Sequence, residues 1–233
     1  MKKMIILIFV ITLLAPLSKA NAMNSEYVEV AKSDTVDVSL YAKKTNGMYT
    51  DFKIDFQGSI LSKPSWENVA NPTWSPQIIS ADINQDGVNE LIIILTTGTG
   101  TGVIEREAHV FHLQKQRLRK KLVEVPVEVL VDDPIAIVLK NVKTELYPSQ
   151  ANINIGNKKY SIDLKPFNIE PEHLFNNINF GNMINFEVQD NQLIAKIGGQ
   201  IAPAGGYIGN IIITYWLKDN MYQAKSIVYE QYE

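Results

Sequence analysis

Oxygen-bearing side chains recur at every second position in one short segment, and this spacing is typical of a metal site. Asp82, Asn84 and Asp86 supply three of them, and Glu90 closes the run four residues later. Calcium takes about six to eight oxygen ligands, and a tight loop of alternating Asp and Asn residues directs several oxygens to one point. Three carboxylates this close together repel one another unless a cation balances them. The pattern therefore predicts a calcium site.

The residues between and after these side chains suit a loop that closes around an ion. Gly87 permits a sharp backbone turn, and the carbonyl oxygen of Val88 is expected to point inward as a further ligand. Ile83 and the apolar run at residues 91–95 would anchor the loop in a sheet on either side. The alternative is a metal-free turn, because Asp and Asn side chains also hydrogen-bond to nearby backbone groups. The predicted ligands of one structural calcium ion are Asp82, Asn84, Asp86, Val88 and Glu90.

The order of residues in the loop distinguishes between known calcium loops. An EF-hand is excluded, because its twelfth position needs a bidentate Glu and here holds Ile93, between strand-like flanks. The pattern DxNxDGxxEL instead resembles the DxDxDGxxDL calcium loop of FG-GAP and VCBS-type repeats, over residues 75–113. The resemblance implies a calcium loop between the strands of a propeller blade. Asn84 replaces an acid and Glu90 replaces Asp, which implies a weaker site or a water ligand. A propeller needs several blades, and the sequence contains the motif once.

Two-residue turns between β-rich runs are the main local signal elsewhere in the chain. Such turns need residues that accept positive φ angles, as Gly, Asn and Asp do. Apolar and polar residues alternate beside the turns, which is the period of a half-buried strand. The continuous apolar runs at residues 91–95 and 211–213 indicate central strands covered on both faces. The predicted turns are Asn46-Gly47, Gly156-Asn157, Asp190-Asn191 and Asp219-Asn220.

Helical periodicity is scarce, so the sequence predicts a mainly β fold. Antiparallel hairpins would form a sandwich or partial propeller-like sheets, with one or two very short helices at residues 127–131 and 171–176. Two prolines flank an acidic stretch at residues 126–134, which is either a linker or a connection within one continuous domain. A linker there would separate a β region with the calcium loop, residues 23–125, from a β-hairpin region, residues 135–233.

Residues 1–22 have the pattern of a signal peptide. Lys2 and Lys3 precede an apolar run at residues 4–14, and cleavage is expected after Ala22, where a small-x-small pattern ends. The run is shorter than the roughly 20 residues that a membrane-spanning helix needs, and no second run of that length follows. We therefore expect a secreted, extracellular protein with no membrane span in the mature chain.

The composition narrows the function further. The formal net charge is −3, which argues against nucleic acid as the main partner because phosphate binding needs clustered Lys and Arg. The chain has no cysteine, which excludes disulfides, thiolate metal sites and a lipid anchor at cysteine. An exported protein without disulfides must hold its loops by packing or by metal. The acidic loop at residues 82–90 is where a metal could serve.

Two segments of the predicted strands could carry chemistry. Residues 96–102, TTGTGTG, lack the Lys-Ser/Thr ending of a phosphate-binding loop and suit a hairpin loop. His109 and His112 are expected on opposite faces of a strand, so they cannot share a metal ion easily. Glu105, Glu107 and His109 share one face, as a catalytic row or, in the ordinary interpretation, as a solvated outer face.

Two further segments are unusual in composition. Residues 115–121 contain five basic residues, which suit a charged edge strand or contact with an anionic polymer. Residues 198–209 are apolar and rich in glycine. They either cross closely over a neighbouring strand or form part of a binding surface.

The sequence contains no GxSxG, HExxH, SxxK or cysteine nucleophile pattern. We therefore expect a non-enzymatic binding or surface-interaction module for a cell-wall or extracellular polymer or protein, in which the calcium loop fixes residues 96–102. The alternatives are a secreted hydrolase that cleaves such a polymer with Glu105 and Glu107, and a structural component of an envelope or spore. The overall pattern also resembles small exported proteins of Gram-positive spore-forming bacteria, and this resemblance implies no activity.

Overall fold

The computed structural model describes residues 26–118, 121–203 and 205–232. The expected signal peptide, residues 1–22, lies outside this range. Two-residue turns divide the described chain into antiparallel hairpins, and all four predicted turns are confirmed. At Asp190-Asn191 both residues have positive φ, 50° and 54°, which the short polar side chains of Asp and Asn tolerate. A further turn of this kind, Gln57-Gly58, was not predicted.

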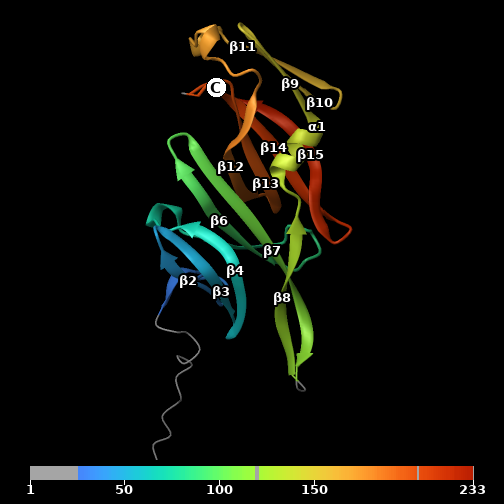
Figure 1. Cartoon of the computed structure of the whole chain (residues 1–233). Helices are drawn as coiled ribbons and strands as arrows, with labels where there is room; N and C mark the ends of the chain where they lie inside the picture. Colours follow the sequence, from blue (N-terminus) through green and yellow to red (C-terminus); the bar gives the residue numbers. More distant parts are fainter. Residues whose placement is uncertain (1–25, 119–120, 204, 233) are drawn as a thin grey trace, which may run out of the picture.

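The first four strands form an antiparallel sheet in sequence order (Figure 1). Alternate residues of its second strand, Val38, Leu40 and Ala42, are buried on one face. This alternation follows from the pleat, which directs successive side chains to opposite faces. The strands are β1 (Tyr27–Lys32), β2 (Val38–Thr45), β3 (Met48–Phe56) and β4 (Ser59–Val69).

A larger sheet contains eight strands in the order β12-β13-β14-β15-β8-β7-β6-β5. Its neighbours are antiparallel except where β15 pairs with β8. β12 also pairs in parallel with β7, so β7, β8, β15, β14, β13 and β12 form a closed ring of strands. The strands are β5 (Gln77–Ala81), β6 (Glu90–Gly100), β7 (Val103–Leu118), β8 (Lys121–Val131), β12 (Asn179–Gln189), β13 (Gln192–Gln200), β14 (Tyr207–Lys218) and β15 (Met221–Gln231).

A third, three-stranded sheet lies at the end of the molecule opposite the first sheet (Figure 1). The only α-helix in the described residues, α1 (Pro134–Asn141), begins at Asp133, whose carboxylate accepts the backbone N–H of Ala136. Within the described residues, no helix is long and apolar enough to cross a membrane. The remaining elements are β9 (Val142–Tyr147), β10 (Gln150–Ile155), β11 (Lys158–Asp163) and the 3-10 helices η2 (Pro72–Trp74), η3 (Lys165–Phe167) and η4 (Pro171–His173).

β6 separates two hydrophobic cores. Leu91, Ile93 and Leu95 pack against the first sheet in what we call the inter-sheet core. Ile92 and Ile94 face the other way, into the ring core, which the closed ring and the third sheet share. The run 91–95 is therefore covered on both faces, as predicted. The run 211–213 is less enclosed, because Ile212 is only half-buried.

The fold is mainly β and antiparallel, as predicted, and the packing of the first sheet on β6 and β7 is that of a sandwich. The helix predicted at residues 127–131 is wrong, because these residues end β8. The helix forms directly after them, where Asp133 and Pro134 supply an N-cap and a first-turn proline. The helix predicted at residues 171–176 is the single turn η4. Most of the acidic stretch at residues 126–134 is strand, and strands from both halves of the chain share the large sheet.

Candidate functional site

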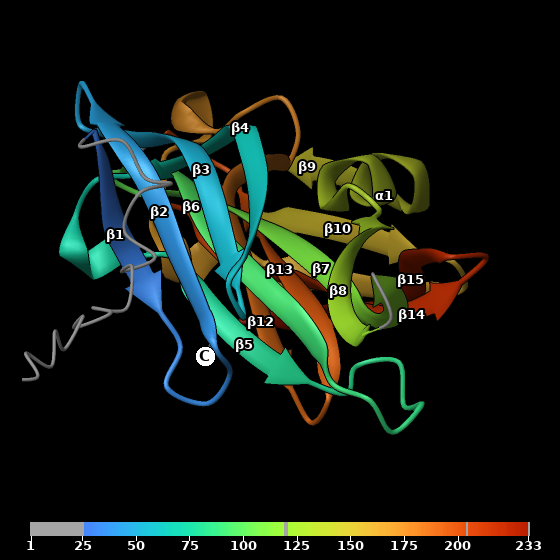
Figure 2. The same ribbon diagram turned by 90° about the horizontal axis from the view of Figure 1, so that it is seen from below.

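The predicted calcium ligands lie in the loop between β5 and β6, which Figure 2 shows leaving the end of β5. Ile83 is 5% exposed and packs in the ring core. Glu90 is the first residue of β6 and is 2% exposed. The loop is therefore anchored at both ends, as its apolar neighbours predicted.

The carboxylates of the loop organise its backbone. The two oxygens of Asp82 accept the N–H groups of Asp86, at 3.0 Å, and Gly87, at 2.9 Å. Asp86 in turn accepts the N–H of Val88 at 2.8 Å. Gly87 has a φ of 87°, a conformation that glycine adopts without strain. These bonds make the tight turn that the sequence predicted. In this turn the Val88 N–H group donates to Asp86.

Asn84 stands at the centre of the side-chain cluster. Its Nδ2 donates to Asp86 Oδ2 at 3.0 Å and to Glu90 Oε1 at 2.8 Å. The second oxygen of Glu90 accepts the N–H groups of Ile83, at 2.9 Å, and Asn84, at 3.3 Å. The structure therefore brings Asn84, Asp86 and Glu90 into direct contact, and Asp82 joins them through the backbone N–H of Asp86.

Glu90 has an unusual electrostatic environment. Burial raises the pKa of its carboxyl group to about 7, and the nearby Asp86 and Asp82 act in the same direction. His112 Nε2 lies 3.9 Å from Glu90 Oε1 and 3.2 Å from Tyr222 Oη. Partial burial lowers the pKa of His112, so its imidazole brings little positive charge to Glu90 at neutral pH. Within the described residues, no group of three or more His, Asp or Glu side chains is arranged to hold a metal ion.

A second cluster of charged residues joins the first sheet to β7 and β8. His109 Nδ1 lies 3.1 Å from Glu128 Oε1, and His109 Nε2 lies 3.7 Å from Glu107 Oε2. Lys63 of β4 pairs with Glu128. The Trp66 ring stacks on the His109 ring, with centroids 4.0 Å apart and planes at 27°. We call these residues the ionic cluster.

The ionic cluster differs from the solvated face that the sequence suggested. The His109 side chain is only 17% exposed, because Trp66 covers it. Sequence reasoning missed Lys63, Trp66 and Glu128, which come from other strands and carry no local signal. Glu105 is exposed. As predicted, His109 and His112 lie on opposite faces, where His109 contacts Trp66 and His112 contacts Tyr222.

The protonation states of the ionic cluster follow from its contacts. Burial lowers the pKa of His109, but Glu107 and Glu128 outweigh burial and raise the pKa above its ordinary value. The hydrogen bond with His109, helped by Lys63, lowers the pKa of Glu128 to about 2. The contact with His109 also lowers the pKa of Glu107. A general acid in glycoside hydrolysis needs a raised pKa, so Glu107 and Glu128 are poorly suited to that role.

The ionic cluster should make stability depend on pH. The raised pKa of His109 stabilises the folded state fully below its unfolded pKa of about 6.5, and this contribution is lost as pH rises through the folded pKa. The lowered pKa of Glu128 stabilises the folded state above its unfolded value of 4.5, and this contribution is lost as pH falls toward 2. We expect His109→Gln to lower the free energy of unfolding more at about pH 6 than at about pH 9. The difference should be only about 1 kcal/mol, because solvent screens the partly exposed Glu128. Urea unfolding at the two pH values measures this difference.

The comparison between wild type and variant isolates His109, because Glu90 and His112 titrate in both proteins. His173→Gln is the matched control, since His173 is exposed in η4. Its cost should be the same at both pH values. An equal cost of His109→Gln at the two pH values would contradict the assignment of a protonated His109.

The Thr/Gly-rich segment is not held by the calcium loop. Residues 96–100 end β6, and the loop at residues 82–90 ends at its first residue, so the two lie at opposite ends of the strand. The buried Asn68 accepts the Thr96 N–H at 2.7 Å, and the Tyr207 hydroxyl donates to the Gly102 carbonyl. These contacts from β4 and β14 hold the hairpin instead.

The glycine-rich residues 198–209 cross closely over their neighbours. A Cβ atom at Gly209 would clash with the carbonyl oxygen of Glu230 and lie 2.7 Å from Tyr229 Oη, and one at Gly198 would lie 3.0 Å from Met183 Cβ. This is the ordinary interpretation of the segment. The basic run at residues 115–121 belongs to the β7–β8 hairpin, and residues 119 and 120 lie outside the described range.

The loop at residues 82–90 and the ionic cluster differ in chemistry. In the loop, the carboxylate oxygens accept backbone N–H groups and the Asn84 amide, whereas the ionic cluster alternates positive and negative side chains that neutralise one another. Of these two sites, only the loop contains carboxylates without an ion pair to another described residue, namely Asp82 and Asp86, while Glu90 has only the 3.9 Å contact with His112. Comparison of the chain with protein-family models, curated proteins and solved structures finds no match.

Proposed function

We propose that the protein is an exported, calcium-stabilised binding module without catalytic activity. One observation carries the calcium assignment. The carboxylates of Asp86 and Glu90 are both directed at one positively polarised atom, the Nδ2 of Asn84, and Glu90 is almost fully buried. A cation at this position would interact with the two carboxylates more favourably than the amide nitrogen does, because it carries a full positive charge.

The donor chemistry of the loop fits calcium. Every proposed ligand atom is an oxygen, which calcium prefers, and calcium accepts irregular geometry more readily than magnesium does. Each carboxylate oxygen of Asp82 accepts one backbone N–H and keeps a lone pair for a metal. Asn84 would bind through its Oδ1 after a turn of its amide group, because its Nδ2 faces Asp86 and Glu90 while its Oδ1 accepts the Asp86 N–H. The residues that would hold the ion are the side chains of Asp82, Asn84, Asp86 and Glu90 and the carbonyl group of Val88.

An ion in this loop would stabilise the fold through its anchors. Ile83 belongs to the ring core, and Glu90 begins the strand that both cores share. Calcium supplies positive charge to a buried carboxylate that otherwise has none close by. The expected consequence is a more stable junction between β5 and β6.

Binding is a better-supported role than hydrolysis. Glu107, which the hydrolase alternative needs, is held in the ionic cluster with a lowered pKa. His109 Nε2 is buried and has no hydrogen-bond partner among the described residues, and the Trp66 ring covers the imidazole. Rigid sheets that present loops and grooves suit a binding role.

The binding role is tested by retention of the purified protein on insoluble cell-wall material with calcium present. We expect saturable retention and no soluble product. Release of product that stops with Glu107→Gln would replace the proposal by a hydrolase. An absence of saturable retention would overturn the binding role, and fractionation with envelope preparations alone would then indicate a structural component.

A further inference from the structure

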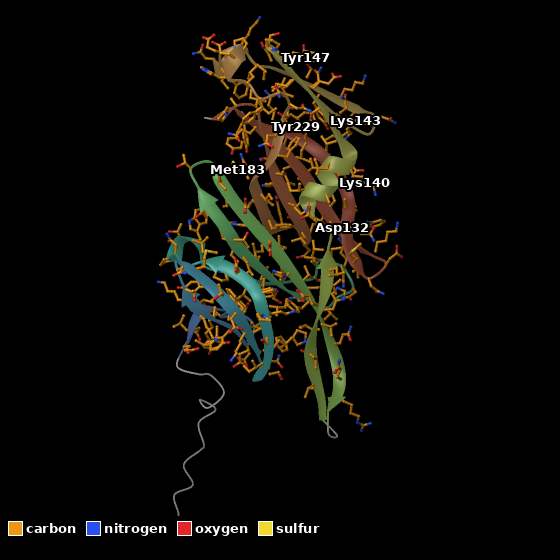
Figure 3. All side chains as sticks on the ribbon, in the orientation of Figure 1. Asp132, Lys140, Lys143, Tyr147, Met183 and Tyr229 are labelled. Carbon is orange, nitrogen blue, oxygen red and sulfur yellow. The ribbon has the colours of Figure 1, made fainter. Side chains whose placement is uncertain are left out.

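An open groove of about 1030 Å³ lies between α1, the β10–β11 turn and β15. Its lining includes the apolar side chains of Ile137, Ile155 and Ile227. Four lysines and two aspartates line it, so the groove is positively charged on a protein whose net charge is −3. Figure 3 shows Lys140 on α1 and Lys143 at the start of β9 on the same side of the molecule.

The four lysines come from four separate elements. Lys140 is in the last turn of α1, and Lys143 pairs with Asn154 of β10. Lys158 begins β11 opposite Ile155. Lys225 lies where the β14–β15 register shifts, between Ala224 and Ser226. Such a bulge re-aims a side chain. All four side chains are exposed, and none forms an ion pair with another described residue.

We propose that this groove binds a polyol phosphate chain, a linear polymer of phosphodiesters and aliphatic hydroxylated units. This inference rests on the proposed binding role and names its ligand. Lysine recognises phosphate as a point charge. A ligand that pairs with all four lysines at once must carry several negative charges. The volume also lies at the upper limit of small-molecule pockets, about 300–1,000 Å³, which favours a segment of a longer chain.

The composition of the lining favours a polyol phosphate over a nucleic acid as the ligand. Single-stranded nucleic acids bind on aromatic side chains that stack on the bases. The described residues that line the groove include no Phe, Tyr or Trp and no Arg. Asn154, Asn157 and Ser226 offer hydrogen bonds to hydroxyl groups, and the isoleucine side chains of the lining can pack against aliphatic carbons.

The aspartates do not oppose this assignment. Asp132 and Asp133 directly precede α1, and the four lysines outnumber them in the lining of the groove. Asp133 is occupied as the helix N-cap. Lys225 also lines a small cavity beside Asn84 and Gln85 of the proposed calcium loop.

The experiment measures binding of poly(glycerol phosphate) to the full-length protein, with calcium present. The test variant changes Lys140, Lys143, Lys158 and Lys225 to Gln. The control variant makes the same change in charge at four exposed lysines outside the groove: Lys32, Lys44, Lys159 and Lys165. We expect the dissociation constant to rise at least about tenfold in the test variant and at most about twofold in the control. Thermal unfolding with and without calcium checks that both variants fold and keep the calcium response.

Each other outcome identifies a specific error. Equal weakening in both variants, or no binding of the wild type at low salt, overturns the groove as the site. Binding of single-stranded DNA as tightly, with the same lysine dependence, overturns the polyol phosphate in favour of nucleic acid. If cell-wall material retains the wild type and the test variant equally, this inference fails and the binding role stands. If the wild type is not retained, the binding role itself fails.

Discussion

We expect calcium to raise the midpoint of thermal unfolding of this protein by about 5–10 °C. A ligand that binds only the folded state stabilises it by about 2.7 kcal/mol at roughly 100 times its dissociation constant. For a chain of this length, about 1 kcal/mol moves the midpoint by about 2–4 °C. The effect arises at Glu90, whose buried carboxylate has the neighbouring Asp82 and Asp86 but no strongly charged cation beside it. Calorimetry with calcium or with a chelator measures the shift.

Two matched variants make the calcium test specific. Asp86→Asn removes one charge and keeps the side-chain shape, so it should abolish most of the shift. Asp190→Asn makes the same change in the exposed turn between β12 and β13, and it should leave the shift intact. Identical melting curves of the wild type with calcium and with chelator would rule out the proposed ion. An equal calcium-induced shift in both variants would show that Asp86 is not a ligand of the ion.

Trp66→Ala should be among the most damaging single substitutions, at a cost of about 3–5 kcal/mol. Trp66 is 6% exposed and joins the inter-sheet core to the ionic cluster. Its ring centroid lies 6.1 Å from that of Phe52, 6.1 Å from that of Phe111 and 4.0 Å from that of His109. The substitution leaves a cavity between the two sheets and exposes His109 to solvent. The midpoint should fall by about 6–20 °C.

Trp216→Ala is the control for this substitution, because Trp216 is 44% exposed on β14. The same atoms are removed there from a surface position, and the expected cost is below about 1 kcal/mol. Urea unfolding of both variants gives the comparison. Similar costs for the two tryptophans would show that the first sheet does not depend on Trp66 for its packing.

The turns and strands were predictable because their signals are local. A pair such as Asp190-Asn191 accepts positive φ angles through its own side chains. Alternation along β2 follows from the pleat, whatever the strand packs against. The prediction of a helix at residues 127–131 failed for the opposite reason. Those apolar residues suit either state, and their pairing in β8 decided between them.

For the candidate site, too, the local contacts were predictable and the long-range part of the prediction was wrong. The spacing of Asp82, Asn84, Asp86 and Glu90 was readable because the loop is contiguous, and the structure brings these residues together through contacts no more than seven residues apart. The idea that this loop holds residues 96–102 was wrong. It treated nearness in sequence as nearness in space, whereas an extended strand separates the two.

By itself, the sequence determined the β class of the fold, the positions of four turns and the residues of the acidic loop. The tertiary structure alone decided the closed ring, in which Met183 of β12 pairs with Ile104 of β7. It also decided the ionic cluster, where Lys63 contacts Glu128 from another sheet, and the groove, whose lysines come from four elements. Such contacts depend on strand register and sheet packing, which are set by the burial of apolar faces over the whole chain rather than by neighbouring residues.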